Sequence, residues 1–194
     1  MTIVLGDIGG TNARLAFSNS DSSNLKGPKI FNCVDFPTIE DLLTHYCKIS
    51  EISPNSLSLA VAGPVLDDHV KLTNGNWEFS KQKIVKNFKL DRAIFINDFT
   101  AQAMAHRDLL QYNRAMPANR LQILRDGMAD QTTPLLVIGP GTGLGVAALV
   151  PAGDDIQVIE GEGGLVSYAP RNSAEDMVLA HLVKEFGHVS AERI

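Results

Sequence analysis

Cysteine and long apolar runs are scarce in this chain. Its 194 residues include two cysteines, Cys33 and Cys47, whose spacing fits neither a metal site nor a disulfide framework. So few cysteines favour a reducing, cytoplasmic setting. The N-terminal apolar run meets Asp7 after a few residues and has no basic lead, which is untypical of a signal peptide or a membrane span.

Positive charge is also in short supply. Lysine and arginine number 17 against 22 acidic residues, which gives a formal net charge of −5 at pH 7. Nucleic acids and anionic membranes are polyanions, so we expect neither as a partner of an acidic chain. Apolar residues make up 44 %, which is enough for a sizeable core in one large or two small domains.

Glycine, by contrast, is concentrated in two turns, each between two short apolar runs. They are GDIGGTN at residues 6–12 and GPGTGLG at residues 139–145. Backbone N–H groups in such Gly/Thr turns can converge on an anion, and two facing turns would hold a polyphosphate from both sides. Neither turn has the P-loop or the dinucleotide pattern, and either one alone is more typical of a tight hairpin.

Asp7 lies inside the first of these turns. A carboxylate there would repel a phosphate unless a cation lay between them. We therefore expect Asp7 to hold Mg²⁺, through the water ligands of the ion. Thr11 and Thr142 add hydroxyl donors to the two turns.

The apolar pattern predicts strands first, then strand–helix units, then strands and a helix. The predicted strands lie at residues 3–5, 13–17, 30–34, 57–62, 93–96, 135–138, 146–150 and 156–159. The polar stretch 111–134 indicates a crossing between domains, at 1–110 and 111–194.

Four helices are expected between these strands. Thr38 and Ser80 are suitable N-caps for the first two, and helical spacing resumes over residues 99–110. Ser173 is the predicted cap of a last helix that reaches Phe186. Its expected C-terminal stop is the glycine that follows Phe186.

Asp98 follows an apolar strand directly, at a place where α/β folds form the rim of a ligand crevice. A carboxylate there can take a proton from a hydroxyl during phosphoryl transfer, while the amide of Asn97 orients the same hydroxyl. The spacing by itself favours a plain N-cap for the helix that follows. These roles conflict, because hydrogen bonds from helix N–H groups make a carboxylate a weaker base.

Two further carboxylates could bind a polar ligand or could be ordinary surface residues, and the residues alone do not decide between these roles. Glu162 lies in EGEGG at residues 160–164, which suits either polyol hydroxyls or an ordinary glycine-rich hairpin. Glu192 follows the last predicted helix, where charged residues are usually solvated.

Five ordered motifs nevertheless resemble the bacterial glucokinase family. They are LGDIGGTNARL at residues 5–15, INDFTA at 96–101, GTGLG at 141–145, GEGG at 161–164 and GHVSAER at 187–193. The resemblance covers the chain from end to end. It implies an α/β, actin-like ATPase (ribonuclease H-like) fold with two α/β domains around a cleft, the second domain being incomplete here.

The resemblance also implies roles for individual residues. Asp98 matches the catalytic base, and Asn97, Glu162 and Glu192 match the residues that hold sugar hydroxyls. The phosphate loops correspond to residues already in the two turns: Gly6, Asp7, Gly9, Gly10, Thr11 and Asn12 in the first, and Gly141, Thr142 and Gly143 in the second. The implied reaction is ATP- and Mg²⁺-dependent phosphorylation of glucose at its 6-hydroxyl, the entry step of glycolysis, by a homodimer.

The chain departs from the family in two respects. Leu165 stands where the family has a histidine that contacts the sugar, so a hexose other than glucose is an alternative substrate. Family members also continue further, so the chain is expected to be an N-terminal fragment with little kinase activity by itself. A non-catalytic sugar-binding protein and an actin-like filament-forming ATPase are the other classes; titration with hexoses separates the sugar-binding classes from the filament.

Overall fold

The structure is a computed structural model that describes residues 1–19, 24–73, 75–107, 122, 124–125, 130, 132–140, 143–153 and 155–194. The chain divides into two compact units, Met1–Ala101 and Gln102–Ile194. Each unit is described by itself below. The predicted domain boundary between residues 110 and 111 lies outside the described residues and stays a prediction.

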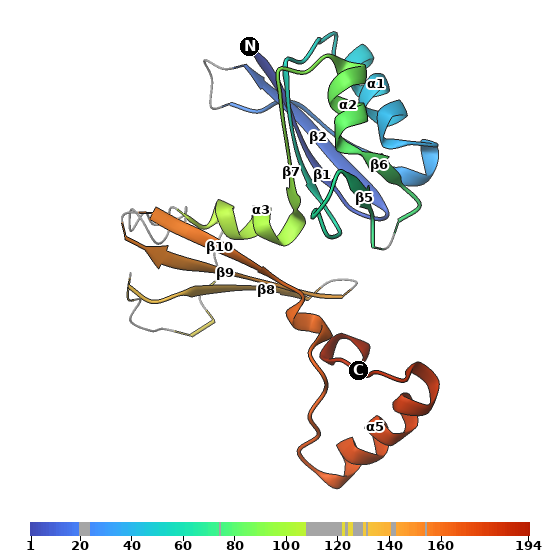
Figure 1. Cartoon of the computed structure of the whole chain (residues 1–194), viewed down its shortest axis with the longest axis vertical. Helices are drawn as coiled ribbons and strands as arrows, with labels where there is room; N and C mark the ends of the chain where they lie inside the picture. The colour runs from blue at the N-terminus through green and yellow to red at the C-terminus, as the bar shows by residue number, and fades with distance from the viewer. Residues whose placement is uncertain are drawn as a thin grey trace. The chain divides into compact units, whose positions relative to one another are not determined.

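The first unit is built on a five-stranded mixed sheet (Figure 1). Its strands, in spatial order, are β3 (Lys26–Asn32), β2 (Asn12–Asn19), β1 (Thr2–Ile8), β4 (Ser56–Val61) and β7 (Arg92–Asn97). β1, β2 and β3 form an antiparallel meander, whereas β4 and β7 run parallel to β1. Parallel neighbours require crossover connections, and these carry the helices of the unit.

Two helices follow caps that the sequence predicted. The Thr38 hydroxyl accepts a hydrogen bond from the Asp41 N–H at 3.1 Å and so begins α1 (Ile39–Ile49). The Ser80 hydroxyl does the same for the Lys83 N–H at 3.1 Å and begins α2 (Lys81–Phe88). A short ribbon of β5 (His69–Lys71) and β6 (Glu78–Ser80) precedes α2.

The third strand was predicted to begin four residues too late and to end two residues too late. β3 begins at Lys26 and ends at Asn32, and a short 3-10 helix, η1 (Cys33–Asp35), replaces the predicted end of the strand. β3 is an edge strand with mostly exposed side chains, so its polar start gave no apolar signal. The Cys33 N–H still donates to the Thr11 carbonyl, 2.8 Å away and in register with the β2/β3 pairs, and η1 begins at this residue.

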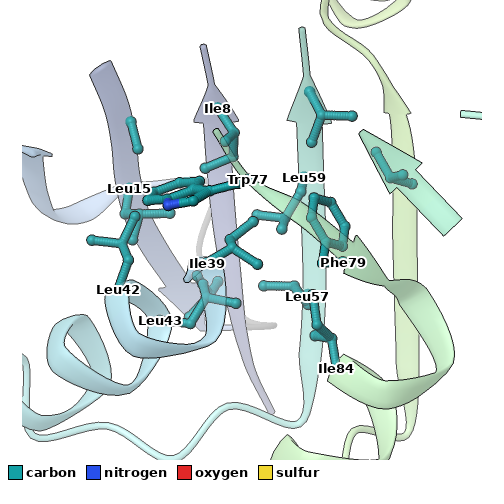
Figure 2. Close-up of a cluster of buried hydrophobic side chains, with 14 of the residues drawn as sticks. Ile8, Leu15, Ile39, Leu42, Leu43, Leu57, Leu59, Trp77, Phe79 and Ile84 are labelled. Carbon is teal, nitrogen blue, oxygen red and sulfur yellow. The ribbon is translucent and has the colours of Figure 1, made fainter. Parts of the chain in front are cut away.

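The core of the first unit lies between the sheet and its helices. Figure 2 shows side chains of α1 and α2 gathered over strand residues such as Leu57 and Leu59. Trp77 joins this cluster with its ring nearly buried, and its indole N–H donates to the Phe36 carbonyl at 3.0 Å. The fully buried Tyr46 hydroxyl likewise donates to the Gly27 carbonyl, at 2.9 Å. Both aromatic polar groups are thus satisfied inside an apolar core.

The second unit contains an antiparallel meander of β8 (Leu135–Pro140), β9 (Leu144–Ala152) and β10 (Asp155–Gly161). After it come η2 (Gly163–Leu165), α5 (Ser173–Phe186) and η3 (Ala191–Arg193). The predicted α5 cap was wrong by one residue: the side chain of Asn172, not of Ser173, accepts from the Glu175 N–H at 3.0 Å. Gly187 ends the helix as predicted, with a φ of 71° that favours glycine.

One helix, α3 (Asp98–Ala105), begins at the end of β7 and runs across the division between the units. Its predicted extension beyond residue 107 lies outside the described residues. None of the helices in the described ranges is long and apolar enough to cross a membrane.

Candidate active site

The first glycine turn connects β1 to β2, as predicted. It is closed by a hydrogen bond from the Gly9 N–H to the Asn12 carbonyl, 2.9 Å away. Neither Gly9 nor Gly10 has a positive φ, so these glycines serve close approach rather than an unusual backbone conformation. At Gly10 the approach comes from Gly75, whose Cβ, if it had one, would lie 3.2 Å from the Gly10 Cα.

Gly6 lies inside β1 rather than in the turn. A Cβ at this position would lie 2.6 Å from Cδ2 of Leu59 and 2.8 Å from Cδ2 of Leu15. Gly6 therefore makes room for two core leucines, which is a packing role. Its predicted part in binding phosphate stays a prediction.

The thiol of Cys33 forms a hydrogen bond with the backbone of the first turn. The buried Cys33 Sγ–H donates to the Gly9 carbonyl at 3.3 Å, and its backbone N–H holds the Thr11 carbonyl. Burial raises the pKa of the Cys33 thiol, so the group stays a neutral donor. A cavity of about 500 Å³ opens beside this contact and is lined by Gly10, Thr11 and Trp77 among others.

Asp7 lies near the carboxyl end of β1. Its Oδ2 accepts from Nη1 of Arg14 at 2.9 Å, directly across the hairpin, where Asp7 and Arg14 are register partners. About half of each side chain is exposed, so the pair contributes little to stability. One carboxylate with an exposed oxygen suits Mg²⁺, which takes one or two carboxylates and keeps several waters.

Asn97 and Asp98 lie at the same edge of the sheet as Asp7. The register aligns Asp7 with Ala60 of β4, and Ala60 with Ile96 of β7. Asp98 therefore follows a strand end two strands away from Asp7, at the edge where the parallel strands finish. The structure thus brings the predicted base and the first turn to one rim of the first unit.

The helix cap at this rim is Asn97, not Asp98. The Asn97 Oδ1 accepts from the N–H groups of Phe99 and Thr100, at 2.9 and 3.3 Å. Its Nδ2 donates to the Gly63 carbonyl at 3.2 Å. These contacts fix the orientation of the amide and leave one N–H of Nδ2 for another acceptor.

Asp98 is consequently the first residue of the helix, and half-buried. Burial raises the pKa of its carboxyl above the ordinary range; the Phe99 N–H, which also reaches the Asp98 Oδ1 at 2.9 Å, opposes this shift, and the charge of Asp7 adds to it. The net direction is upward. A raised pKa makes Asp98 a stronger base when ionised, which is the opposite of what a simple capping role would produce.

The second unit gathers a different set of predicted residues. The Glu192 Oε2 accepts from the Leu144 N–H at 3.0 Å, next to Gly143. Gly164 of η2 lies against the same carboxylate. Gly141 and Thr142, predicted in the second phosphate turn, lie outside the described residues.

Glu162 and Leu165 occupy the two ends of the η2 turn. Glu162 is exposed, and its carbonyl accepts from the Leu165 N–H at 2.9 Å. Leu165 is 45 % exposed. The sequence predicted Glu162 and Glu192 as members of one site, and the structure brings both to the η2 region of the second unit.

The sequence analysis did not predict several contacts of the candidate site residues. The contact of Arg14 with Asp7 could have been predicted, because a hairpin centred on residues 9–12 places Arg14 opposite Asp7. Cys33 and Gly63 have none, since each meets its partner from a distant part of the chain. Leu144 makes its contact through the backbone N–H, which a pattern of side chains does not predict.

Comparison with known proteins gives a consistent family. A sequence model described as glucokinase matches residues 4–194. The glucokinase of Tolumonas auensis is 38 % identical over 193 residues, which cover 99 % of this chain and 58 % of that protein. The glucokinase of Chromohalobacter salexigens is 38 % identical over 192 residues, with 98 % and 58 % covered. The chain thus spans 58 % of the length of these curated relatives.

Solved structures agree on the fold. A crystal structure of a glucokinase from an Antarctic psychrotroph superposes with a TM-score of 0.75 at 33 % identity, over 98 % of this chain and 59 % of that one. A glucokinase from Balamuthia mandrillaris in complex with glucose gives 0.73 at 21 % identity, over 100 % of this chain and 59 % of that one, which bears on the fold alone. The predicted α/β, actin-like sugar-kinase fold is confirmed.

Proposed function

The chain belongs to the glucokinase family, and from this premise we propose that its protein transfers the γ-phosphoryl group of ATP to the 6-hydroxyl of glucose or a related hexose. The observation that carries the proposal is Asp98: a half-buried carboxylate with a raised pKa at the sheet edge that also carries the first glycine turn. A hydroxyl proton needs such an acceptor when the oxygen attacks phosphorus.

The chemistry assigned to each residue follows from its surroundings. Asp98 takes the proton of the attacking hydroxyl, and the free N–H of Asn97 donates to an oxygen of the sugar, because its other polar atoms are engaged within the protein. The glycine turns present backbone N–H groups to the phosphates. Glu162 and Glu192 accept from sugar hydroxyls.

Asp7 is the residue proposed to hold Mg²⁺, through water. The ion would supply charge neutralisation for the β- and γ-phosphates when ATP is bound. The exposed carboxylate of Asp7 fits this, with Arg14 occupying only its Oδ2. A homodimer in the cytoplasm is the assembly and location that the family resemblance favours; sedimentation of the purified protein tests the dimer.

Replacement of Asp98 by alanine tests the central step. We expect kcat to fall by about 10²–10⁴-fold, with little change in the Kd for glucose, since the carboxylate acts on the transferred proton. A coupled assay for ADP release measures turnover, and calorimetry measures sugar binding. If the variant turned over glucose at the wild-type rate, Asp98 would have only a structural role.

Leu165 favours a second candidate, a kinase for a hexose that differs at one hydroxyl. Leucine offers no hydrogen bond, and an unpaired hydroxyl in a closed site costs ~1–3 kcal/mol, or roughly 5- to 150-fold in affinity. The replacement Leu165→His should then tighten glucose binding. The control Leu165→Phe should not, because phenylalanine has a ring of similar size to that of histidine but no ring nitrogen. Equal affinities in the two variants would remove the basis for a different hexose.

We further propose that the 194-residue chain alone has little kinase activity. Within α5 no described side chain is buried, and Met177 is 69 % exposed, so the apolar side of the helix is uncovered. The chain also spans only 58 % of the curated relatives. Normal ADP release from this chain would contradict the proposal.

A further inference from the structure

Glu192 makes a contact with the protein that a residue reserved for sugar would not need. Its Oε2 accepts from the Leu144 N–H at 3.0 Å, at the point where the second glycine turn passes into β9. The two residues are 48 positions apart in the sequence. Hydrogen bonds to a charged acceptor are among the stronger ones, so this contact fixes the backbone of Leu144.

Two glycines shape the space that receives this carboxylate. A Cβ at Gly143 would lie 2.6 Å from the Glu192 Oε2, and a Cβ at Gly164 would lie 2.8 Å from the same atom. Both distances are far below van der Waals contact. Glycine at both positions therefore keeps open the place that the carboxylate occupies.

The segment that carries Glu192 is itself held firmly within the second unit. The Tyr168 N–H donates to the Val189 carbonyl at 2.9 Å, and Ser167 and Ser190 form an antiparallel β-bridge through their backbones. Val189 and Ser190 are buried, with 3 % and 0 % of their surfaces exposed. The Glu192 carboxylate therefore projects from an anchored backbone rather than from a free end.

We propose that Glu192 is a positioning residue for the end of the second glycine turn, acting through the Leu144 N–H, and that it thereby sets the affinity for the nucleotide as well as contacting the sugar. The nucleotide part rests on the proposed kinase function; the link to Leu144 and Gly143 does not. One carboxylate then serves both substrates, because Oε2 holds the turn and Oε1 is left for a hydroxyl.

The kinetic test compares Glu192→Ala with Glu192→Gln in the intact protein. Alanine removes the acceptor, so KM for ATP should rise by about fivefold, as expected for loss of an exposed hydrogen bond to a charged group. The carbonyl oxygen of glutamine still accepts from the Leu144 N–H, and KM for ATP should rise by no more than about twofold. Measurements are made at a temperature at which all variants are folded, so that a lowered stability alone leaves KM for ATP unchanged.

A double-mutant cycle tests the link without any substrate. Gly143→Ala should lower the thermal midpoint of wild type, because its Cβ meets the Glu192 Oε2. In the Glu192→Ala background the loss should shrink by at least half. Gly164→Ala is the matched control: its Cβ would also collide with the Leu144 carbonyl, so most of its cost should persist in that background.

The outcomes separate the inference from the proposed function. If Glu192→Ala raises KM for the sugar alone, or if Gly143→Ala costs the same in both backgrounds, the positioning role is overturned. If the wild-type protein phosphorylates no hexose, the kinase function fails, and the cycle still decides whether Glu192 positions the turn.

Discussion

The side chain of Asn97 should be worth a measurable part of the stability of the first unit. Its Oδ1 accepts from the N–H groups of Phe99 and Thr100, and its Nδ2 donates to the Gly63 carbonyl. In Asn97→Ala the Phe99 N–H keeps the Asp98 Oδ1 as acceptor, at 2.9 Å. The groups left without a partner are the Thr100 N–H and the Gly63 carbonyl.

Two lost hydrogen bonds of about 0.5–1.5 kcal/mol each predict a decrease of about 1–3 kcal/mol in the free energy of unfolding. This agrees with the ~0.5–2 kcal/mol usual for loss of an N-cap. The control Asn97→Ser keeps a hydroxyl acceptor for the helix and loses only the Gly63 contact, so about half of the stability should return. Urea unfolding measures both variants, and the m-value should stay unchanged.

A free energy of unfolding within about 0.5 kcal/mol of wild type for Asn97→Ala would refute this reasoning. Serine that performs no better than alanine would refute the capping part of it. If Asn97→Ala left stability intact and raised only KM for the sugar, Asn97 would act on the ligand alone.

Three further outcomes are expected. Burial raises the pKa of Asp98, so its ionisation opposes folding once the pH rises above the ordinary aspartate pKa of about 3.9. The substitution Asp98→Asn should therefore raise the thermal midpoint at pH 7 and leave it unchanged at pH 3. Equal effects of the substitution at both pH values would contradict this. Gly6→Ala should destabilise by about 1–3 kcal/mol in urea unfolding, because its Cβ would lie 2.6 Å from the Leu59 Cδ2; a neutral effect would show that the core yields there. Tyr46→Phe should lower the free energy of unfolding by about 1 kcal/mol through the Gly27 carbonyl it leaves unpaired, and an unchanged value would mean that water replaces the phenol.

Local patterns predicted most of the elements of the fold. Thr38 and Ser80 cap helices because a hydroxyl accepts from an N–H three residues ahead, and this geometry depends on neighbours in the chain alone. Gly187 ends α5 through its own backbone conformation, which is also a local property. The start of the edge strand β3 escaped prediction because an exposed strand needs no apolar side chains, and its pairing with β2 is what defines it.

The sequence by itself predicted the α/β class, the caps Thr38 and Ser80, the first glycine turn and, through the family resemblance, Asp98 and Glu192 as candidate site residues. Only the tertiary structure decided what surrounds them. Asn97 meets Gly63 across 34 residues and Glu192 meets Leu144 across 48. Which strand ends and backbone N–H groups become neighbours follows from the order of the strands and the packing of the core, and a linear pattern carries no measure of either.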